Sequence, residues 1–158
     1  MAGSALRPLS HELVAFLEGP LAVVVATRDE ELRPEVARGW GLEVADERTT
    51  VTLCVGDPPG SRTRANLETN GAIAVTCSRP STYRTVQLKG SALELRPPGE
   101  RELAAVRRHL EAFVEEVEPL GVRSEGARTF VGSELLSVTF EVRELYDQTP
   151  GPTAGARL

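Results

Sequence analysis

Apolar and polar residues alternate along several short segments of this chain, and a period of two is the pattern of β-strands with one buried face. Residues 21–27 are apolar almost throughout and predict a strand buried on both faces. Together these patterns predict six strands, over residues 21–27, 35–44, 50–55, 72–77, 84–95 and 136–143. The first and second strands, and the fourth and fifth, are joined by connections too short to hold a helix. We therefore expect a mainly β (α+β) fold, an antiparallel barrel with peripheral helices, rather than a doubly wound parallel sheet.

The fifth predicted strand changes phase at Gly90. Val86 and Leu88 are its apolar members before the glycine, and Leu93 and Leu95 are its apolar members after it. A slip of one residue at a glycine indicates a β-bulge, which bends a strand sharply. Small barrels require such bends, so the slip favours a closed barrel.

Three helical segments interrupt the strands. Ser10 is the predicted N-cap of a short helix that ends at Gly19-Pro20, and Ser61 is the predicted cap of a second short helix that runs through Leu67. A long helix follows Pro97-Pro98, and its apolar residues recur at helical spacing: Leu103, Val106, Leu110, Phe113, Val114 and Val117. We expect one domain over residues 1–147. Residues 148–158, rich in Pro and Gly, form a tail that is either disordered or an arm across a partner subunit.

Composition and charge exclude several classes of protein. The chain has 158 residues, of which 41% are hydrophobic and 26% charged, as in an ordinary globular domain. A net charge of −5 argues against electrostatic binding of nucleic acid. The longest apolar run, residues 21–26, is far too short to span a membrane, and residues 1–7 lack the apolar stretch of a signal peptide. We therefore expect a cytoplasmic protein that binds neither nucleic acid nor membrane.

The cysteines and histidines predict no metal site. Cys54 and Cys77 lie in predicted strands and are not spaced as a ligand pair, so buried thiols are expected, with a disulfide left open. His11 and His109, the only histidines, lie on different predicted helices, where a solvated helix face is the expected position for each. No hydrolase, phosphate-loop or dinucleotide motif is present. The catalytic residues, if any, stay unknown.

Residues 61–64, Ser-Arg-Thr-Arg, form the best candidate anion site in the sequence. They open a predicted helix, whose first backbone N–H groups are unpaired and carry a partial positive charge. Arginine opposes the helix dipole at this end, and a bound phosphate would reverse that effect. The alternative is an ordinary serine cap with solvated arginines, and the sequence leaves both open.

Further candidate ligand contacts lie on two strands. Arg38 shares a predicted strand face with Val36 and Trp40, and a charge on an apolar face needs a partner. That partner is either a ligand or the solvent and subunit contacts available at a barrel rim. Thr85 and Gln87 share a face near the predicted bulge, where they either face water or line a groove that hydrogen-bonds a heterocycle.

The turn and the strands around it resemble a known family. Residues 60–67, Gly-Ser-Arg-Thr-Arg-Ala-Asn-Leu, then Asn70 and the strand 73–78, are similar to the pyridoxamine 5′-phosphate oxidase-like group of FMN-binding split barrels, in which Ser-Arg-Lys opens a helix. Residues 84–90 resemble the next family strand. The closing residues 146–152, Tyr-Asp-Gln-Thr-Pro-Gly-Pro, resemble an uncharacterised branch of the group. The resemblance in the order of elements covers residues 10–147.

This resemblance implies a six-stranded split barrel that forms a homodimer and binds FMN in two clefts between the subunits. Ser61 and Arg62 match positions that hold the FMN phosphate. Thr63 stands where a lysine is common, and Arg64 is the candidate replacement for that charge. The full set of candidate cofactor-binding residues is Arg38, Val55, Gly56, Ser61, Arg62, Thr63, Arg64, Thr85 and Gln87.

The match departs from true pyridoxamine phosphate oxidases at several positions. Arg38 matches only loosely an arginine of the second strand, and Thr85 stands where the oxidases place a glutamine near the flavin ring, with Gln87 two residues further on. An arginine and a histidine that hold the substrate phosphate have no match after Leu120. This departure argues against oxidation of vitamin B6.

The leading prediction is an FMN-dependent oxidoreductase that acts on an unidentified small molecule, with the redox chemistry supplied by the flavin. One alternative is a reductase that uses the deazaflavin F420, or haem, on the same barrel. The other is a non-catalytic protein that binds a flavin, haem or another small molecule.

Overall fold

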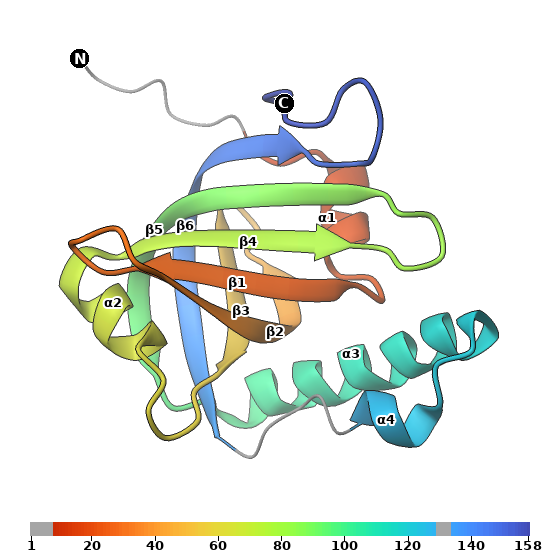
Figure 1. The fold of residues 1–158 in the computed structure, drawn as a ribbon, viewed down its shortest axis with the longest axis horizontal. Helices are drawn as coiled ribbons and strands as arrows, with labels where there is room; N and C mark the ends of the chain where they lie inside the picture. Colours follow the sequence, from red (N-terminus) through yellow and green to blue (C-terminus); the bar gives the residue numbers. More distant parts are fainter. Residues whose placement is uncertain (1–7, 129–133) are drawn as a thin grey trace.

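The computed structural model describes residues 8–128 and 134–158, which form a closed barrel of six antiparallel strands (Figure 1). Around the barrel the strands follow the order β1-β2-β3-β6-β5-β4. This confirms the predicted six-stranded antiparallel barrel. The strands are β1 (Ala22–Arg28), β2 (Pro34–Val44), β3 (Thr50–Gly56), β4 (Ala72–Ser78), β5 (Thr85–Arg96) and β6 (Leu135–Asp147).

The helices lie outside the barrel, as predicted. α3 runs along one side of it and packs against β2, while α2 lies beside the β1–β2 turn (Figure 1). Among the described residues, none of these helices combines the length and the apolar character needed to cross a membrane. They are α1 (His11–Leu17), α2 (Thr63–Asn70), α3 (Glu100–Val117), a 3₁₀ turn (Glu118–Leu120) and α4 (Ser124–Arg128).

The prediction that β1 is buried on both faces was wrong. Val23 and Val25 are each 1% exposed in the barrel core, whereas Val24 and Ala26 point outward and are half-buried. Because the outward residues of this strand are also small and apolar, its sequence shows no alternation of apolar and polar residues. β1 therefore has an apolar outer face as well as a buried inner one.

β2 contains a bulge that the sequence did not reveal. The register with β3 shifts between Trp40 and Glu43, around Gly41, whose φ is +64°. Trp40 therefore packs outside the barrel under α3, while Leu42 packs in the barrel core. The face that Val36 shares with Trp40 therefore ends at Gly41, and Leu42 lies on the opposite side of the strand.

A bulge lies at Gly90 as predicted, but its extra residue is Arg143 of β6, so β5 does not change phase there. The register between β5 and β6 shifts between Lys89 and Gly90, and a Cβ atom on Gly90 would lie 1.9 Å from the carbonyl oxygen of Glu141. A second shift between Ala92 and Glu94 makes Leu93 the extra residue of β5, so the strand changes phase there. Leu93 is 61% exposed, and its predicted position on the core-facing side was wrong.

His109 is buried, contrary to the expectation of a solvated helix face. Its Nδ1 atom accepts a hydrogen bond of 2.7 Å from the N–H of Gly41, and its Nε2 lies 2.8 Å from the carbonyl oxygen of Leu21. The first contact makes Nδ1 the acceptor, so Nε2 carries the proton and donates it to Leu21. His109 thereby joins α3 to both β2 and the residue that precedes β1. His11, by contrast, is exposed.

The tail is ordered, so the first of the two arrangements expected for it, disorder, was wrong. Residues 148–158 turn back onto β6 of the same chain, where Arg157 forms a bridge with Tyr146 and the N–H of Leu158 donates to the carbonyl oxygen of Leu145 at 2.9 Å.

The two cysteines are free and buried, and no disulfide joins them. Burial raises the pKa of the Cys77 thiol to about 12, so this thiol stays protonated at neutral pH.

Candidate functional site

The candidate site is a cleft where β2 and β3 separate. Their pairing ends at Gly39 and Val55, and from there residues 34–38 continue alongside β1 while the chain leaves β3 at Gly56. The two segments enclose a cleft of about 560 Å³. Its lining includes Glu35 and Arg38 from β2, Gly56 and Ser61 from the opposite side, and Glu134 before β6.

The turn of residues 57–62 forms one wall of this cleft and leads into α2. The helix begins at Thr63 with Arg62 as its N-cap, so the cap lies one residue later than the predicted Ser61 cap. Ser61 still contributes, because its hydroxyl accepts a hydrogen bond of 3.2 Å from the N–H of Thr63. The N–H of Ser61 donates in turn to the carbonyl oxygen of Pro58 at 2.9 Å. The turn is therefore internally braced, with the Ser61 hydroxyl at the start of the helix.

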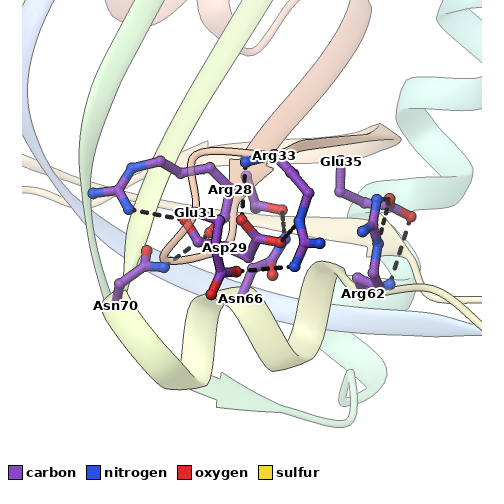
Figure 2. Close-up of polar contacts among 9 residues, drawn as sticks. Arg28, Asp29, Glu31, Arg33, Glu35, Arg62, Asn66 and Asn70 are labelled. Atoms are coloured by element: carbon purple, nitrogen blue, oxygen red, sulfur yellow. Dashed lines mark hydrogen bonds and ion pairs between the residues drawn. The ribbon is translucent and has the colours of Figure 1, made fainter.

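Helix α2 is fixed to the end of β1, as Figure 2 shows. The side-chain amide of Asn66 donates to Thr27 Oγ1 at 3.0 Å, and that of Asn70 donates to the carbonyl oxygen of Arg28 at 2.8 Å. Both bonds are made by side chains on one side of the helix. The start of α2 is thereby held at a set position relative to the cleft.

Glu35 places a carboxylate at the start of α2. It shares the inward-facing phase of β2 with Ala37 and Gly39, and it lies opposite Thr27 of β1. Its Oε1 accepts from the N–H of Arg62 at 3.5 Å, and its Oε2 accepts from Nε and Nη2 of the same residue at 3.3 and 3.1 Å (Figure 2). The Glu35 carboxylate therefore lies at the position where the sequence predicted the binding of an anion.

The charges around the cleft balance. Arg64 pairs with Asp57 at 3.1 Å, as Arg62 pairs with Glu35. Arg38 and Glu134 add one charge of each sign to the lining. The Arg62 side chain is 52% exposed and that of Glu35 25%, so solvent screens this pair and its partner can be exchanged at low cost.

Two of the predicted cofactor-binding residues do not present their side chains to the cleft. Val55 is 0% exposed and belongs to the barrel core, so only its backbone borders the site. Thr63 is 1% exposed, beneath the first turn of α2. Of the other candidates, Arg38, Gly56 and Ser61 line the cleft, and Arg62 lies at its edge.

Thr85 and Gln87 lie outside the cleft, on the outer face of β5. Gln87 pairs across the sheet with Thr76, which pairs with Val24, which pairs with Arg38. Three strand spacings put the two ends of this row roughly 14 Å apart. The Gln87 amide donates to Thr76 Oγ1 at 2.9 Å, and the hydroxyls of Thr85 and Ser78 are 2.8 Å apart.

Small side chains form the surface between these two groups. The outward residues of β1 and β4 that lie there are half-buried, and none is larger than valine: Val24, Ala26, Ala72, Ala74, Thr76 and Ser78. They form a low, mostly apolar face with Arg38 at one side and Gln87 at the other. Such a face lets a flat molecule or a second protein surface approach closely.

Sequence reasoning missed Glu35. A weak signal was present, since Glu35 shares the thin face of the strand with Ala37 and Gly39, and a carboxylate among small residues needs a cation. Only the fold shows that the cation is Arg62, which lies 27 residues further along the chain. No cluster of potential metal ligands occurs among the described residues.

The fold and this cleft define a six-stranded barrel of the pyridoxamine 5′-phosphate oxidase type. The sequence model of the pyridoxamine 5′-phosphate oxidase family matches residues 9–145, and the chain belongs to this family. None of the curated protein sequences matches the chain.

Solved structures with the same fold share little sequence with the chain. An F420 reductase superposes with a TM-score of 0.58 at 17% identity, over 87% of this chain and 97% of that one. A putative pyridoxamine 5′-phosphate oxidase from Lactobacillus delbrueckii gives 0.55 at 14% identity, over 89% and 95%. An FMN-binding protein from Syntrophomonas wolfei gives 0.50 at 11% identity, over 85% and 84%. At these identities the likeness concerns the fold.

Proposed function

We propose that the protein is an FMN-dependent oxidoreductase acting on a small molecule, with the FMN phosphate held at the start of α2. The observation that carries the proposal is the Glu35 carboxylate, which the backbone N–H and the guanidinium of Arg62 already bind. The hydrogen-bond donors of Arg62 that bind this carboxylate can also bind the phosphate of a ligand. The structure of an FMN-binding protein on the same fold supports the choice of ligand.

The residues at this position suit a phosphate. Ser61 supplies a hydroxyl, Arg62 a guanidinium and a backbone N–H, and the start of α2 a partial positive charge. Arg38 lines the same cleft and supplies a second cation. Charge-assisted hydrogen bonds of this kind are the stronger ones in proteins, and a phosphate accepts several at once.

The outer face of β1 and β4 is the proposed place for the flavin ring. Its small side chains permit a flat ring to lie close to the sheet, and Thr85 and Gln87 offer polar groups at the far side. Bound FMN would supply hydride and electron transfer, while the chain binds and orients it. The substrate is a small molecule of unknown identity.

A homodimer is part of this proposal. The face of β1 and β4 presents small, mostly apolar side chains, and a second copy laid on it would enclose the flavin between two chains. The family resemblance implies the same arrangement. Substrate and flavin would then be shielded from water by the partner subunit.

F420 is the second candidate cofactor, because an F420 reductase has the same fold and superposes over 87% of this chain. For haem, the third alternative, buried His109 is no ready axial ligand because both ring nitrogens are engaged.

Titration of the apoprotein with FMN, F420 and haem, followed by visible spectroscopy, tests the proposal. We expect saturable FMN binding, and we expect Arg62→Ala to weaken it by at least ~1 kcal/mol, about fivefold, because a charged hydrogen bond is lost. Arg33→Ala is the control, since Arg33 pairs with Asp29 and Glu31 on the nearby β1–β2 turn. No FMN binding at high micromolar concentration would reject the proposal. Tight binding without turnover, when NAD(P)H and an acceptor are supplied, would favour a non-catalytic binding protein.

A further inference from the structure

We propose that Glu35 is an internal competitor for the cofactor phosphate: its carboxylate occupies Arg62 in the free protein and leaves it when a phosphate binds. The inference rests on the proposed function. It assigns to Glu35 a role in setting the affinity of the protein for phosphorylated ligands, according to the charge of their phosphate. Glu35 comes from β2, and Arg62 comes from the start of α2.

The geometry of the contact is that of an anion in a binding site. The two carboxylate oxygens of Glu35 take both kinds of donor that Arg62 offers, the backbone N–H at 3.5 Å and the guanidinium at 3.1 and 3.3 Å. A phosphate at the start of α2 would use the same donors. The two anions therefore exclude one another at Arg62.

The position of Glu35 makes the exchange possible. Its side chain is 25% exposed and lines the cleft, so the carboxylate can turn to solvent when a ligand enters. Glu35 also belongs to the stretch of β2 that has separated from β3, where the cleft leaves room beside it. Exposed ion pairs of this kind add little net stability, because solvent screening and side-chain entropy offset the attraction.

The charge of the cleft gives the contact a role in selection. With Glu35 in place Arg62 is already paired, so a phosphate monoester with nearly two negative charges meets both an occupied Arg62 and a nearby carboxylate. An uncharged flavin, such as riboflavin, meets neither obstacle. Removal of the Glu35 charge should therefore change the affinity for phosphorylated ligands and leave the affinity for riboflavin unchanged.

Calorimetric titration of FMN and riboflavin into wild type and the Glu35→Gln variant tests this. The substituted glutamine keeps an oxygen that can accept the N–H of Arg62 but loses the charge. We expect Glu35→Gln to bind FMN about fivefold to tenfold more tightly, with riboflavin affinity changed less than about twofold. The matched control is Glu31→Gln, which removes a carboxylate from the nearby β1–β2 turn that pairs with Arg33 instead (Figure 2). We expect it to change neither affinity by more than about twofold.

Two results would overturn the inference and leave the proposed function standing. One is an unchanged or weaker FMN affinity in Glu35→Gln while Arg62→Ala still weakens FMN binding. The other is an equal gain for riboflavin, which would show that the effect does not pass through the phosphate. If neither protein binds FMN, the proposed function fails, and inorganic phosphate then serves as the probe. Tighter phosphate binding by Glu35→Gln would support the competition, and equal binding would overturn it.

Discussion

His109 shows how a single buried side chain joins two layers of this molecule. Its imidazole accepts from Gly41 and donates to Leu21, and Trp40 lies against it with ring centroids 5.5 Å apart. Both backbone groups lie in a buried interface between α3 and the barrel. Each depends on the histidine for its hydrogen bond, which makes this contact a sensitive point for stability.

His109→Ala is expected to lower the free energy of unfolding by about 2–4 kcal/mol, since it leaves a buried N–H and a buried C=O unpaired and opens a cavity. Denaturant unfolding followed by circular dichroism measures the change. His11→Ala, at an exposed helix position, is the control and should stay within about 0.5 kcal/mol of wild type. A loss below about 1 kcal/mol for His109→Ala would contradict this account of the contact.

The same histidine predicts a pH dependence. Burial lowers the pKa of His109 in the folded protein, and protonation of Nδ1 would also oppose the N–H of Gly41. The unfolded chain therefore binds a proton that the folded chain does not, and stability falls as the pH drops below about 6.5, by at most ~1.4 kcal/mol per pH unit. Glu102, whose pKa Arg96 lowers to about 2, stays ionised across this window.

Unfolding free energies measured between about pH 7.5 and 5.5 test this prediction. The decline should be shallower in His109→Gln, which cannot be protonated there. Equal slopes for wild type and variant would assign the pH dependence to other groups.

Among the elements, β5 depends most on one glycine. At Gly90 the strand meets β6 so closely that a Cβ atom would overlap the carbonyl oxygen of Glu141, at 1.9 Å. Gly90→Ala is expected to cost about 3 kcal/mol or more, or to prevent folding, because backbone atoms of both strands must move. Gly126→Ala in α4 is the control, since a Cβ atom there meets nothing within 4 Å. Thermal unfolding of the two variants gives the comparison, and a Gly90→Ala protein as stable as wild type would contradict the close approach.

The two bulges explain how much of the fold could be predicted from the sequence. In β5 the apolar pattern itself changes phase, so an irregularity could be predicted, although the residue that shifts the phase is Leu93 rather than Gly90. At Gly41 the apolar residues Trp40 and Leu42 continue in phase across the bulge, because the strand there is covered by the barrel core on one side and by α3 on the other. A strand that is buried on both sides has no alternation of apolar and polar residues, so a bulge does not disturb its sequence pattern.

Only part of the candidate site, likewise, could be predicted from the sequence. The turn of residues 61–64 could be recognised because its residue types suit an anion and follow one another in the sequence. The Glu35–Arg62 pair and the burial of His109 could not, since each depends on a contact between elements that are distant along the chain. Local chemistry could be predicted from the sequence, and the pairing of distant charges could not.

At the scale of the whole molecule, the proposed homodimer rests on the outer face of β1 and β4. Ala74→Arg places a long charged side chain in the middle of this face without entering the core, because Ala74 points outward between buried Ile73 and Val75. We expect wild type to have twice the chain mass of 17.0 kDa and the variant to be a monomer that binds FMN weakly. Light scattering measures the mass. Glu115→Arg, on the exposed side of α3, is the control, and a dimeric Ala74→Arg protein would place the interface elsewhere.

The central claim is that a phosphate replaces the Glu35 carboxylate at the start of α2. A crystal structure of the protein grown with FMN tests it most directly. The account predicts the phosphate within hydrogen-bond distance of Ser61 Oγ and the Arg62 guanidinium, with Glu35 turned away from Arg62. A structure that holds FMN with its phosphate elsewhere, and with the Glu35–Arg62 pair intact, would contradict it.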